Sequence, residues 1–195
     1  KFIARFSLAL GGEHNISNAL SVIALGLSLG IDIKFIKNAL CSYQGSARRL
    51  EIKFQDNDYT IIDDYAHHPS EIKATLMAAG NLNPKRVIAI FQPHRFSRTK
   101  LLFNEFIKSF KAVDCLIVTE IYPAGEEPID GINAGILSRS IKEYYGNKEV
   151  EFLPKEEIIS RVYEISRPGD LIITLGAGDI SRLSDDLAEK FKDKE

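Results

Sequence analysis

Residues 59–69 read YTIIDDYAHHP, and they join a strand-like apolar run to the start of a helix. The run 59–62 is β-prone, and the sequence after Pro69 has a helical pattern to about Ala79. Two carboxylates, a phenol and two imidazoles crowd the tight turn between them. In an open α/β sheet, ligands bind at the carboxyl ends of strands. The turn therefore predicts a functional corner; the alternative is a polar turn in which Pro69 only opens the next helix.

Strands and helices alternate on both sides of this corner. Strands are predicted over residues 49–54 and 59–63, paired across the turn 56–58, and over 86–91, 115–118, 150–152 and 170–175. Helices are predicted over residues 69–79, 98–110, 134–145, 155–166 and 180–192. This alternation predicts an α/β fold, with a Rossmann-like, mostly parallel sheet and helices on both of its faces.

The first part of the chain has a different pattern. Residues 1–10 alternate as a half-buried strand does, and helices are predicted over residues 13–29 and 32–41. The polar stretch 43–47 then separates this short helical segment from the strands and helices that follow. We therefore predict two domains, residues 1–46 and 47–195.

Composition limits the classes of function. The chain of 195 residues is 45% hydrophobic and 27% charged, as in a globular protein with a sizeable core. Its formal net charge of -2 argues against a surface that binds nucleic acid or anionic membrane as a whole. The apolar stretch 20–29 is too short and too interrupted to span a bilayer. Cys41 and Cys115 are expected to be buried free thiols of a cytoplasmic protein.

A basic cluster follows the predicted strand 86–91, where residues 92–98 read QPHRFSR. Ser97 is predicted to cap the next helix, which would place Arg98 beside a helix N-terminus that favours anions. Arginine also offers a bidentate fork for a carboxylate or phosphate. The cluster predicts an anion site, and the alternative is a solvated basic loop.

Two further loops follow predicted strands. Residues 120–126 read EIYPAGE and are interpreted as a lid or an extra wall of the crevice, or else as a plain long loop. Residues 176–179 read GAGD, a shortened dinucleotide fingerprint without its third glycine. These glycines indicate either close backbone packing or the approach of a ligand.

Polar side chains also occur at the ends of the first segment. His14, Asn15 and Asn18 gather at a predicted helix N-terminus, where Asn15 could act simply as a cap. Arg48 and Arg49 lie at the predicted domain boundary. They are either solvated or reach into a cleft between the domains, where small-molecule sites often form.

Several unbroken motifs resemble the Mur ligases, the ATP-dependent amide-forming enzymes of peptidoglycan precursor synthesis. They are GEHNISNA at 12–19, RRLE at 48–51 and DDYAHHPSE at 63–71. Three more motifs are similar to the branch of the family that adds L-alanine: FQPHRFSRT at 91–99, IYPAGE at 121–126 and GAGD at 176–179. The resemblance covers essentially the whole chain.

The resemblance implies a particular place in a larger protein. The family has a UDP-sugar domain, a central ATPase domain and a Rossmann-like C-terminal domain. Residues 1–46 look like the tail of the central domain, and residues 47–195 look like the complete C-terminal domain. The chain contains no Gly-x-x-x-x-Gly-Lys-Ser/Thr motif for phosphates. We therefore expect a fragment that is inactive alone, with the Mg²⁺ ligands mainly in the missing part and no metal site of its own.

The resemblance also implies a reaction and its residues. ATP phosphorylates the carboxylate of UDP-N-acetylmuramate, and the amine of L-alanine then attacks the acyl phosphate. The positions that match the family's nucleotide site are His14, Asn15 and Asn18 near the base, Asp64 at the ribose hydroxyls, and Arg49. The positions that match its amino-acid site are Tyr65, His67, His94, Arg95 and Arg98. His67 is the candidate general base, and the two arginines would clamp the carboxylate of L-alanine.

Three alternatives stay open at this point. A related ligase that recycles murein tripeptide shares the histidine-rich corner, although the residues 92–95 favour the L-alanine branch. A stand-alone nucleotide- or amino-acid-binding module is the non-enzyme alternative. A Rossmann dehydrogenase is disfavoured, because the glycine fingerprint is incomplete.

Overall fold

The computed structural model of the chain describes residues 2–9, 13–43 and 45–192, without the side chains of Glu13 and His14. It divides into two compact units, residues 1–47 and 48–195, and each is considered by itself. The first unit contains the helices α1 (Glu13–Ser28) and α2 (Ile33–Ser42), which confirms the two helices predicted there. The carboxylate of Asp32 caps α2 by accepting a hydrogen bond of 2.8 Å from the amide of Lys34.

The predicted strand over residues 1–10 is wrong for the described residues 2–9, which form no strand. Phe2 and Ile3 are 82% and 64% exposed. A strand needs a neighbour to complete its backbone hydrogen bonds, and the other described elements of this unit are helices. Cys41 is also exposed rather than buried, because α2 buries only Ile36; Cys115 is buried as expected.

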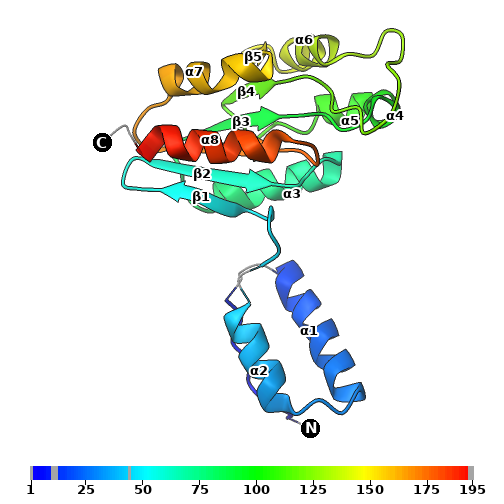
Figure 1. The fold of residues 1–195 in the computed structure, drawn as a ribbon, viewed down its shortest axis with the longest axis vertical. Coiled ribbons are helices and arrows are strands. Elements are labelled where there is room, and N and C mark those ends of the chain that lie inside the picture. Colours follow the sequence, from blue (N-terminus) through cyan, green and yellow to red (C-terminus); the bar gives the residue numbers. More distant parts are fainter. Residues whose placement is uncertain (1, 10–12, 44, 193–195) are drawn as a thin grey trace. The chain divides into compact units, whose positions relative to one another are not determined.

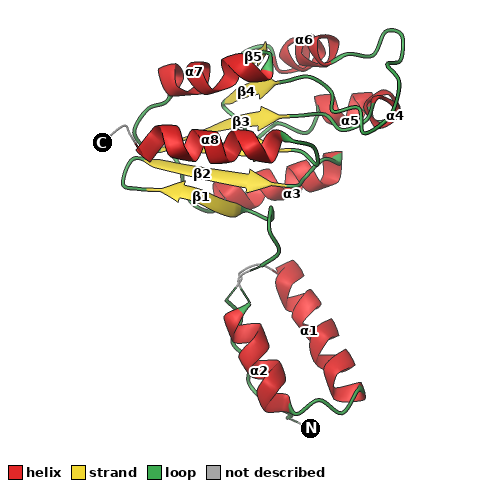
Figure 2. Cartoon of the chain, viewed as in Figure 1, coloured by secondary structure: helices red, strands yellow, loops and turns green. Residues whose placement is uncertain are grey.

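The second unit is an α/β domain, which confirms the predicted fold class. Its strands are β1 (Glu51–Gln55), β2 (Tyr59–Asp64), β3 (Arg86–Phe91), β4 (Cys115–Val118), β5 (Glu149–Phe152) and β6 (Asp170–Leu175). Its helices are α3 (Pro69–Gly80), α4 (Phe96–Leu101), α5 (Phe103–Ile107), α6 (Ala134–Tyr145), α7 (Lys155–Ile165) and α8 (Ile180–Lys192). Figure 2 shows the strands in one layer with helices around them.

The six strands are ordered β1-β2-β6-β3-β4-β5, and only the β1–β2 pair is antiparallel. The chain moves in one direction from β2 to β5 and then returns to insert β6 between β2 and β3. Right-handed crossovers place the helices of the connections from β2 to β5 on one face of the sheet, and the helix of the return connection to β6 on the other. Figure 1 accordingly shows α8 in front of the sheet and α3 behind it.

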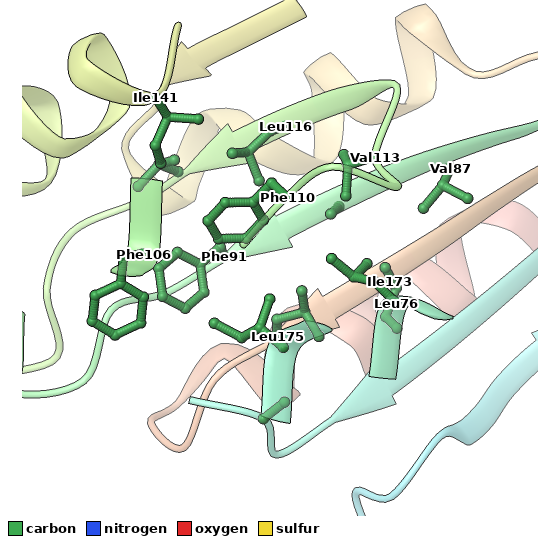
Figure 3. Close-up of a cluster of buried hydrophobic side chains, with 14 of the residues drawn as sticks. Leu76, Val87, Phe91, Phe106, Phe110, Val113, Leu116, Ile141, Ile173 and Leu175 are labelled. Carbon is green, nitrogen blue, oxygen red and sulfur yellow. The ribbon is translucent and has the colours of Figure 1, made fainter. Parts of the chain in front are cut away.

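Alternation along the strands builds a separate core on each face. In β3, Ala89 and Phe91 belong to one cluster, and Ile88 and Ile90 belong to the other. The first cluster lies under α3, α5 and α6 and includes the aromatic group of Phe91, Phe106 and Phe110 (Figure 3). The second lies under α7 and α8. Because both faces are covered, β3 and β6 are apolar along almost their whole length.

The helix predicted over residues 98–110 is instead two short helices, α4 and α5, that meet at Leu102. Leu102 has φ −109° and ψ 22°, outside helical geometry. Neither helix contains Gly or Pro, so the sequence carries no local signal of the break. Tertiary packing decides it: Leu102, Phe103 and Phe106 all contact the first core cluster.

Candidate functional site

The parallel register brings the carboxyl ends of four strands to one edge of the sheet. Asp64 and Phe91 both pair with Leu175, and Phe91 also pairs with Val118. The polar stretches predicted after these strands therefore start from neighbouring positions. They are residues 65–68, 92–98, 120–126 and 176–179. This edge is where an open α/β sheet binds its ligands.

The corner 63–69 is built by capping of α3. His68 is the N-cap residue, and its Nδ1 accepts from the amide of Ser70. Glu71 returns its carboxylate to the amides of His67 and His68 at 3.1 and 3.2 Å. This capping box, with Pro69 at the first helical turn, fixes the direction in which the corner leaves the sheet.

Asp64 lies at the centre of the corner and is only 3% exposed. Its carboxylate accepts from the amides of Leu50 and Ala66, each at 2.8 Å, and from Thr75 Oγ1 at 3.0 Å. Burial raises the pKa of Asp64, and these three donors oppose the rise. A carboxylate has about four acceptor positions, so about one is left for a further donor. Asp64 therefore holds the corner together whatever else it binds.

The structure distinguishes Arg48 from Arg49, which the sequence alone could not do: Arg48 joins two segments of the second unit. Its Nε donates to the fully buried Asp63 at 2.7 Å, and its Nη atoms donate to the carbonyls of Gly176 and Gly178. The side chain thereby ties β2 to the loop after β6. Arg49 is exposed, and its guanidinium carbon lies 5.9 Å from the centre of the Tyr65 ring. Of the two arginines, Arg49 is the one left accessible to a ligand.

Four rings form a continuous row along the sheet edge. The Tyr65 and His67 rings meet edge to face at 5.1 Å, and the His67 and His94 rings are 5.6 Å apart. The His94 ring then stacks on Tyr122, with centroids 5.6 Å apart and planes at 15°. The structure thus brings together three predicted site residues and adds Tyr122. The sequence marked the loop of Tyr122 as a wall but did not single out this residue.

His67 is oriented by its own corner. Its Nδ1 lies 2.9 Å from the carbonyl oxygen of Tyr65 and 3.7 Å from the carboxylate of Glu71. A carbonyl oxygen only accepts, so Nδ1 carries a proton and donates it. In the neutral ring, Nε2 is then the acceptor. This is the tautomer that a general base acting through Nε2 requires.

The arginines after β3 lie beside a carboxylate of the chain itself. Ser97 does not cap α4, because the N-cap residue is Arg95, whose own side chain makes no cap hydrogen bond. Instead the Ser97 amide and hydroxyl donate to Glu126 at 2.9 and 2.6 Å. Arg95 Nη1 is 3.7 Å from the same carboxylate. The first turn of α4, predicted to attract an anion from outside, is thus already bonded to Glu126.

Two buried polar atoms of this region have no hydrogen-bond partner among the described residues: His94 Nδ1 and Arg98 Nη1. Unsatisfied buried polar atoms are rare, and a ligand is one way in which they are satisfied. His68, Arg95, Ser97, Arg98, Leu101 and Leu102 line a cavity of about 390 Å³. Arg95 and Arg98 therefore share an open cavity with His68 of the corner.

We expect His94 to titrate below its ordinary pKa of about 6.5. Burial lowers its pKa first, followed by the charge of Arg98. The unfolded chain then binds the proton more readily. The contribution of His94 to stability is thus present above about pH 6.5 and is lost as the pH falls through the folded pKa. Arg98→Met should raise the midpoint of His94 in an NMR titration. Lys100→Met, an exposed charge on the same helix, is the control; an equal shift in both variants would contradict the assignment to Arg98.

Gly176 and Gly178 serve close backbone packing. A Cβ atom on Gly178 would lie 2.6 Å from Cγ of Tyr122, and one on Gly176 would lie 2.9 Å from the carbonyl oxygen of Gln92. The side-chain amide of Gln92 in turn donates to Asp179 at 2.8 Å and accepts from the amide of Ile180. Of the two interpretations left open by the sequence, the geometry favours close packing.

The remaining predicted nucleotide residues belong to the first unit. Asn15 and Asn18 lie in the first turns of α1, with Asn15 partly buried and Asn18 exposed. The side chain of His14 lies outside the described residues. Their role at a nucleotide base stays a prediction.

In the part of the chain that the structure describes, no three His, Cys, Asp or Glu side chains gather as metal ligands. Among the same residues, no helix is both long and apolar enough to cross a bilayer.

Known proteins match this chain in both sequence and structure. Residues 48–178 match the family model described as Mur ligase, glutamate ligase domain. A UDP-N-acetylmuramate–L-alanine ligase from Desulforapulum autotrophicum is 49% identical over 185 residues, which are 94% of this chain and 40% of that protein. The ligase of the same name from Pelotomaculum thermopropionicum is 40% identical over 194 residues, 100% of this chain and 42% of that protein.

Two crystal structures have the same fold. That of a UDP-N-acetylmuramate–alanine ligase from Thermotoga maritima is 32% identical, with a TM-score of 0.78 over 97% of this chain and 40% of that one. A murein peptide ligase from Psychrobacter arcticus is 25% identical, with a TM-score of 0.69 over 94% of this chain and 38% of that one. The chain thus spans about two fifths of the length of these relatives.

Proposed function

The chain belongs to the Mur ligase family, and we propose that it is the C-terminal part of an ATP-dependent ligase that joins L-alanine to UDP-N-acetylmuramate. This reaction would serve peptidoglycan precursor synthesis in the cytoplasm. The observation that carries the proposal is the row of Tyr65, His67 and His94 on the same sheet edge as Arg95 and Arg98. Two imidazoles and two guanidinium groups suit an amino acid, whose carboxylate needs a cationic clamp and whose amine must lose a proton.

In this proposal the arginines bind the carboxylate of L-alanine. Arg95 keeps about half of its side chain exposed, and Arg98 has a buried nitrogen without a hydrogen-bond partner among the described residues. Nε2 of His67 accepts a proton from the amine, and Tyr65 forms the wall beside it. His94, whose pKa is lowered by burial and by Arg98, stays neutral and adds no charge near the amine. Holding the amine close to its electrophile supplies much of the rate.

The nucleotide would lie against the corner itself. The remaining acceptor position of Asp64 suits a ribose hydroxyl, and the exposed guanidinium of Arg49 suits a phosphate. When bound, ATP supplies the phosphoryl group that makes the muramate carboxylate reactive. The described residues contain no cluster fit for Mg²⁺. In this proposal the metal ligands and the phosphate-binding loop lie elsewhere in the full-length protein, and residues 1–195 are inactive alone.

We also propose that residues 1–46 are the tail of the central ATPase domain, and that residues 47–195 are the C-terminal domain. Apolar side chains of α1 and α2 support this assignment: Ile16, Leu20, Leu25 and Phe35 are 53%, 61%, 61% and 69% exposed. Large apolar side chains left exposed in this number indicate a surface that another element covers.

The full-length protein is expected to form ADP only when ATP, UDP-N-acetylmuramate and L-alanine are all present. A coupled assay for ADP, with each substrate omitted in turn, measures this. Residues 1–195 alone should form no ADP above background. ADP formation by residues 1–195 alone would contradict the dependence on the missing domains.

A second candidate is a ligase that recycles murein tripeptide, which the likeness to the Psychrobacter arcticus murein peptide ligase keeps open. The same assay separates the two, since tripeptide would then replace L-alanine as the required substrate. If residues 1–195 instead bind ATP or L-alanine tightly and the full-length protein turns over neither substrate, the chain is a binding module.

A further inference from the structure

The loop between β4 and α6 returns to the segment that carries His94 and Arg95. The amide of Tyr122 donates to the carbonyl of Pro93, and the amide of Arg95 donates to the carbonyl of Tyr122, each at 2.8 Å. His94 and Tyr122 thereby form a parallel bridge beyond the ends of β3 and β4. Figure 1 shows this loop reaching α4. Two backbone hydrogen bonds from this loop therefore fix the segment that carries His94 and Arg95 of the proposed amino-acid site.

Glu126 fastens the middle of that loop. Its two carboxylate oxygens accept separately from the amide and the hydroxyl of Ser97, at 2.9 and 2.6 Å. These bonds lower the pKa of Glu126, the hydroxyl bond first, so the carboxylate is charged at neutral pH. Hydrogen bonds to a charged acceptor are stronger than those between neutral groups.

The turn that Glu126 holds is a demanding one. Arg95 has φ +71°, in the left-handed region that a residue with a side chain adopts only when its surroundings impose it. One bond on the Arg95 amide and two on Ser97 impose it here. The side chain of the N-cap residue, Arg95, makes no cap hydrogen bond, so the Glu126 carboxylate takes over the role of a cap by accepting from the Ser97 amide.

Glu126 is bonded closely to Ser97 and only loosely to Arg95. The Arg95 Nη1 to Glu126 Oε1 distance of 3.7 Å is longer than a hydrogen bond, and 49% of the Arg95 side chain is exposed. The guanidinium group of Arg95 is therefore kept near the site, and Glu126 forms no direct hydrogen bond with its Nη1. A substrate carboxylate can then form the direct hydrogen bonds that Glu126 does not make.

We propose that Glu126 is a positioning residue for the amino-acid site: by anchoring Ser97 it fixes the turn 93–97 and holds Arg95 ready for the carboxylate of the incoming amino acid. This inference rests on the proposed function. It predicts that replacing Glu126 raises the KM for the amino acid and leaves the KM for ATP almost unchanged, because the corner at Asp64 is held by other contacts.

The test uses the full-length protein in the ADP assay. Glu126→Ala should raise the KM for L-alanine roughly tenfold, with the KM for ATP within about twofold, since one charge-assisted anchor is lost. Glu126→Gln keeps an acceptor for Ser97 and should recover most of the affinity. Glu127→Ala removes a neighbouring exposed carboxylate and should change neither constant. An unchanged KM for L-alanine in Glu126→Ala, or equal rises for both substrates, would overturn the inference.

A second measurement does not depend on the reaction. Amide hydrogen exchange over residues 93–102 should be roughly tenfold faster in Glu126→Ala than in the wild type or Glu127→Ala, because the Ser97 amide loses its acceptor. Equal exchange in all three proteins would overturn the anchor. A wild-type protein that turns over no L-alanine would contradict the proposed function. Faster exchange in Glu126→Ala would still support the anchor in that case.

Discussion

Replacing Arg48 with Ala is expected to lower the free energy of unfolding of the chain by about 3–5 kcal/mol. The carboxylate of Asp63 is fully buried, and Arg48 is its charged partner at 2.7 Å. Without that partner a charge stays buried and unpaired, and the carbonyls of Gly176 and Gly178 lose their donors. Urea unfolding of residues 1–195, followed by circular dichroism, measures the change.

Arg49→Ala is the matched control for this prediction. Arg49 has the same charge and is adjacent in sequence, but it is exposed and faces the Tyr65 ring instead of a buried carboxylate partner in direct contact. Its loss should change the free energy of unfolding by less than about 0.5 kcal/mol. Combining Arg48→Met with Asp63→Asn removes both buried charges and should recover part of the loss. Equal effects of Arg48→Ala and Arg49→Ala would show that the clamp does not stabilise the fold.

Replacing Arg95 with Ala in the full-length protein should raise the KM for L-alanine roughly 10–100-fold, because one or two charge-assisted hydrogen bonds to the carboxylate are lost. The KM for ATP and the stability should change little, since Arg95 is exposed and pairs only loosely with Glu126. Steady-state kinetics in which each substrate is varied separately measure the effect.

Two further variants sharpen this prediction. Arg95→Lys keeps the charge but loses the planar fork, so its KM for L-alanine should fall between those of Arg95→Ala and the wild type. Lys100→Ala removes an exposed charge of the same helix and should leave both constants unchanged. An effect of Arg95→Ala that is confined to ATP would reject the carboxylate clamp.

Most of the second unit could be predicted because its periodicity is strong. The strands 86–91, 115–118 and 170–175 and the helices 134–145 and 180–192 have the predicted bounds. Both faces of the sheet are covered, so these strands are nearly continuous apolar runs that polar loops delimit. The strand predicted at 1–10 does not form over the described residues 2–9, because alternation of apolar residues alone provides no pairing partner.

Part of the candidate site could be predicted in the same way. The sequence predicts Tyr65, His67 and His94 at strand ends, and the parallel register places these ends side by side. The His67 ring then lies 5.1 Å from the Tyr65 ring and 5.6 Å from the His94 ring. The contributions of Tyr122 and Glu126 could not be predicted. Their loop meets residues 93–97 through contacts whose geometry depends on where β4 ends relative to β3.

The corner 59–69 shows how far each source of information reaches. By itself the sequence determined a strand, a titratable turn and a helix opened by Pro69, because apolar periodicity and proline act locally. Only the tertiary structure separated the two carboxylates. It buried Asp63 against Arg48 and added donors from Leu50 and Thr75 to the one that Asp64 receives from the nearby Ala66. It also bonded Ser97 to Glu126 and made Arg95 the N-cap residue of α4. Hydrogen bonds between segments far apart in sequence exist only once the sheet has aligned them.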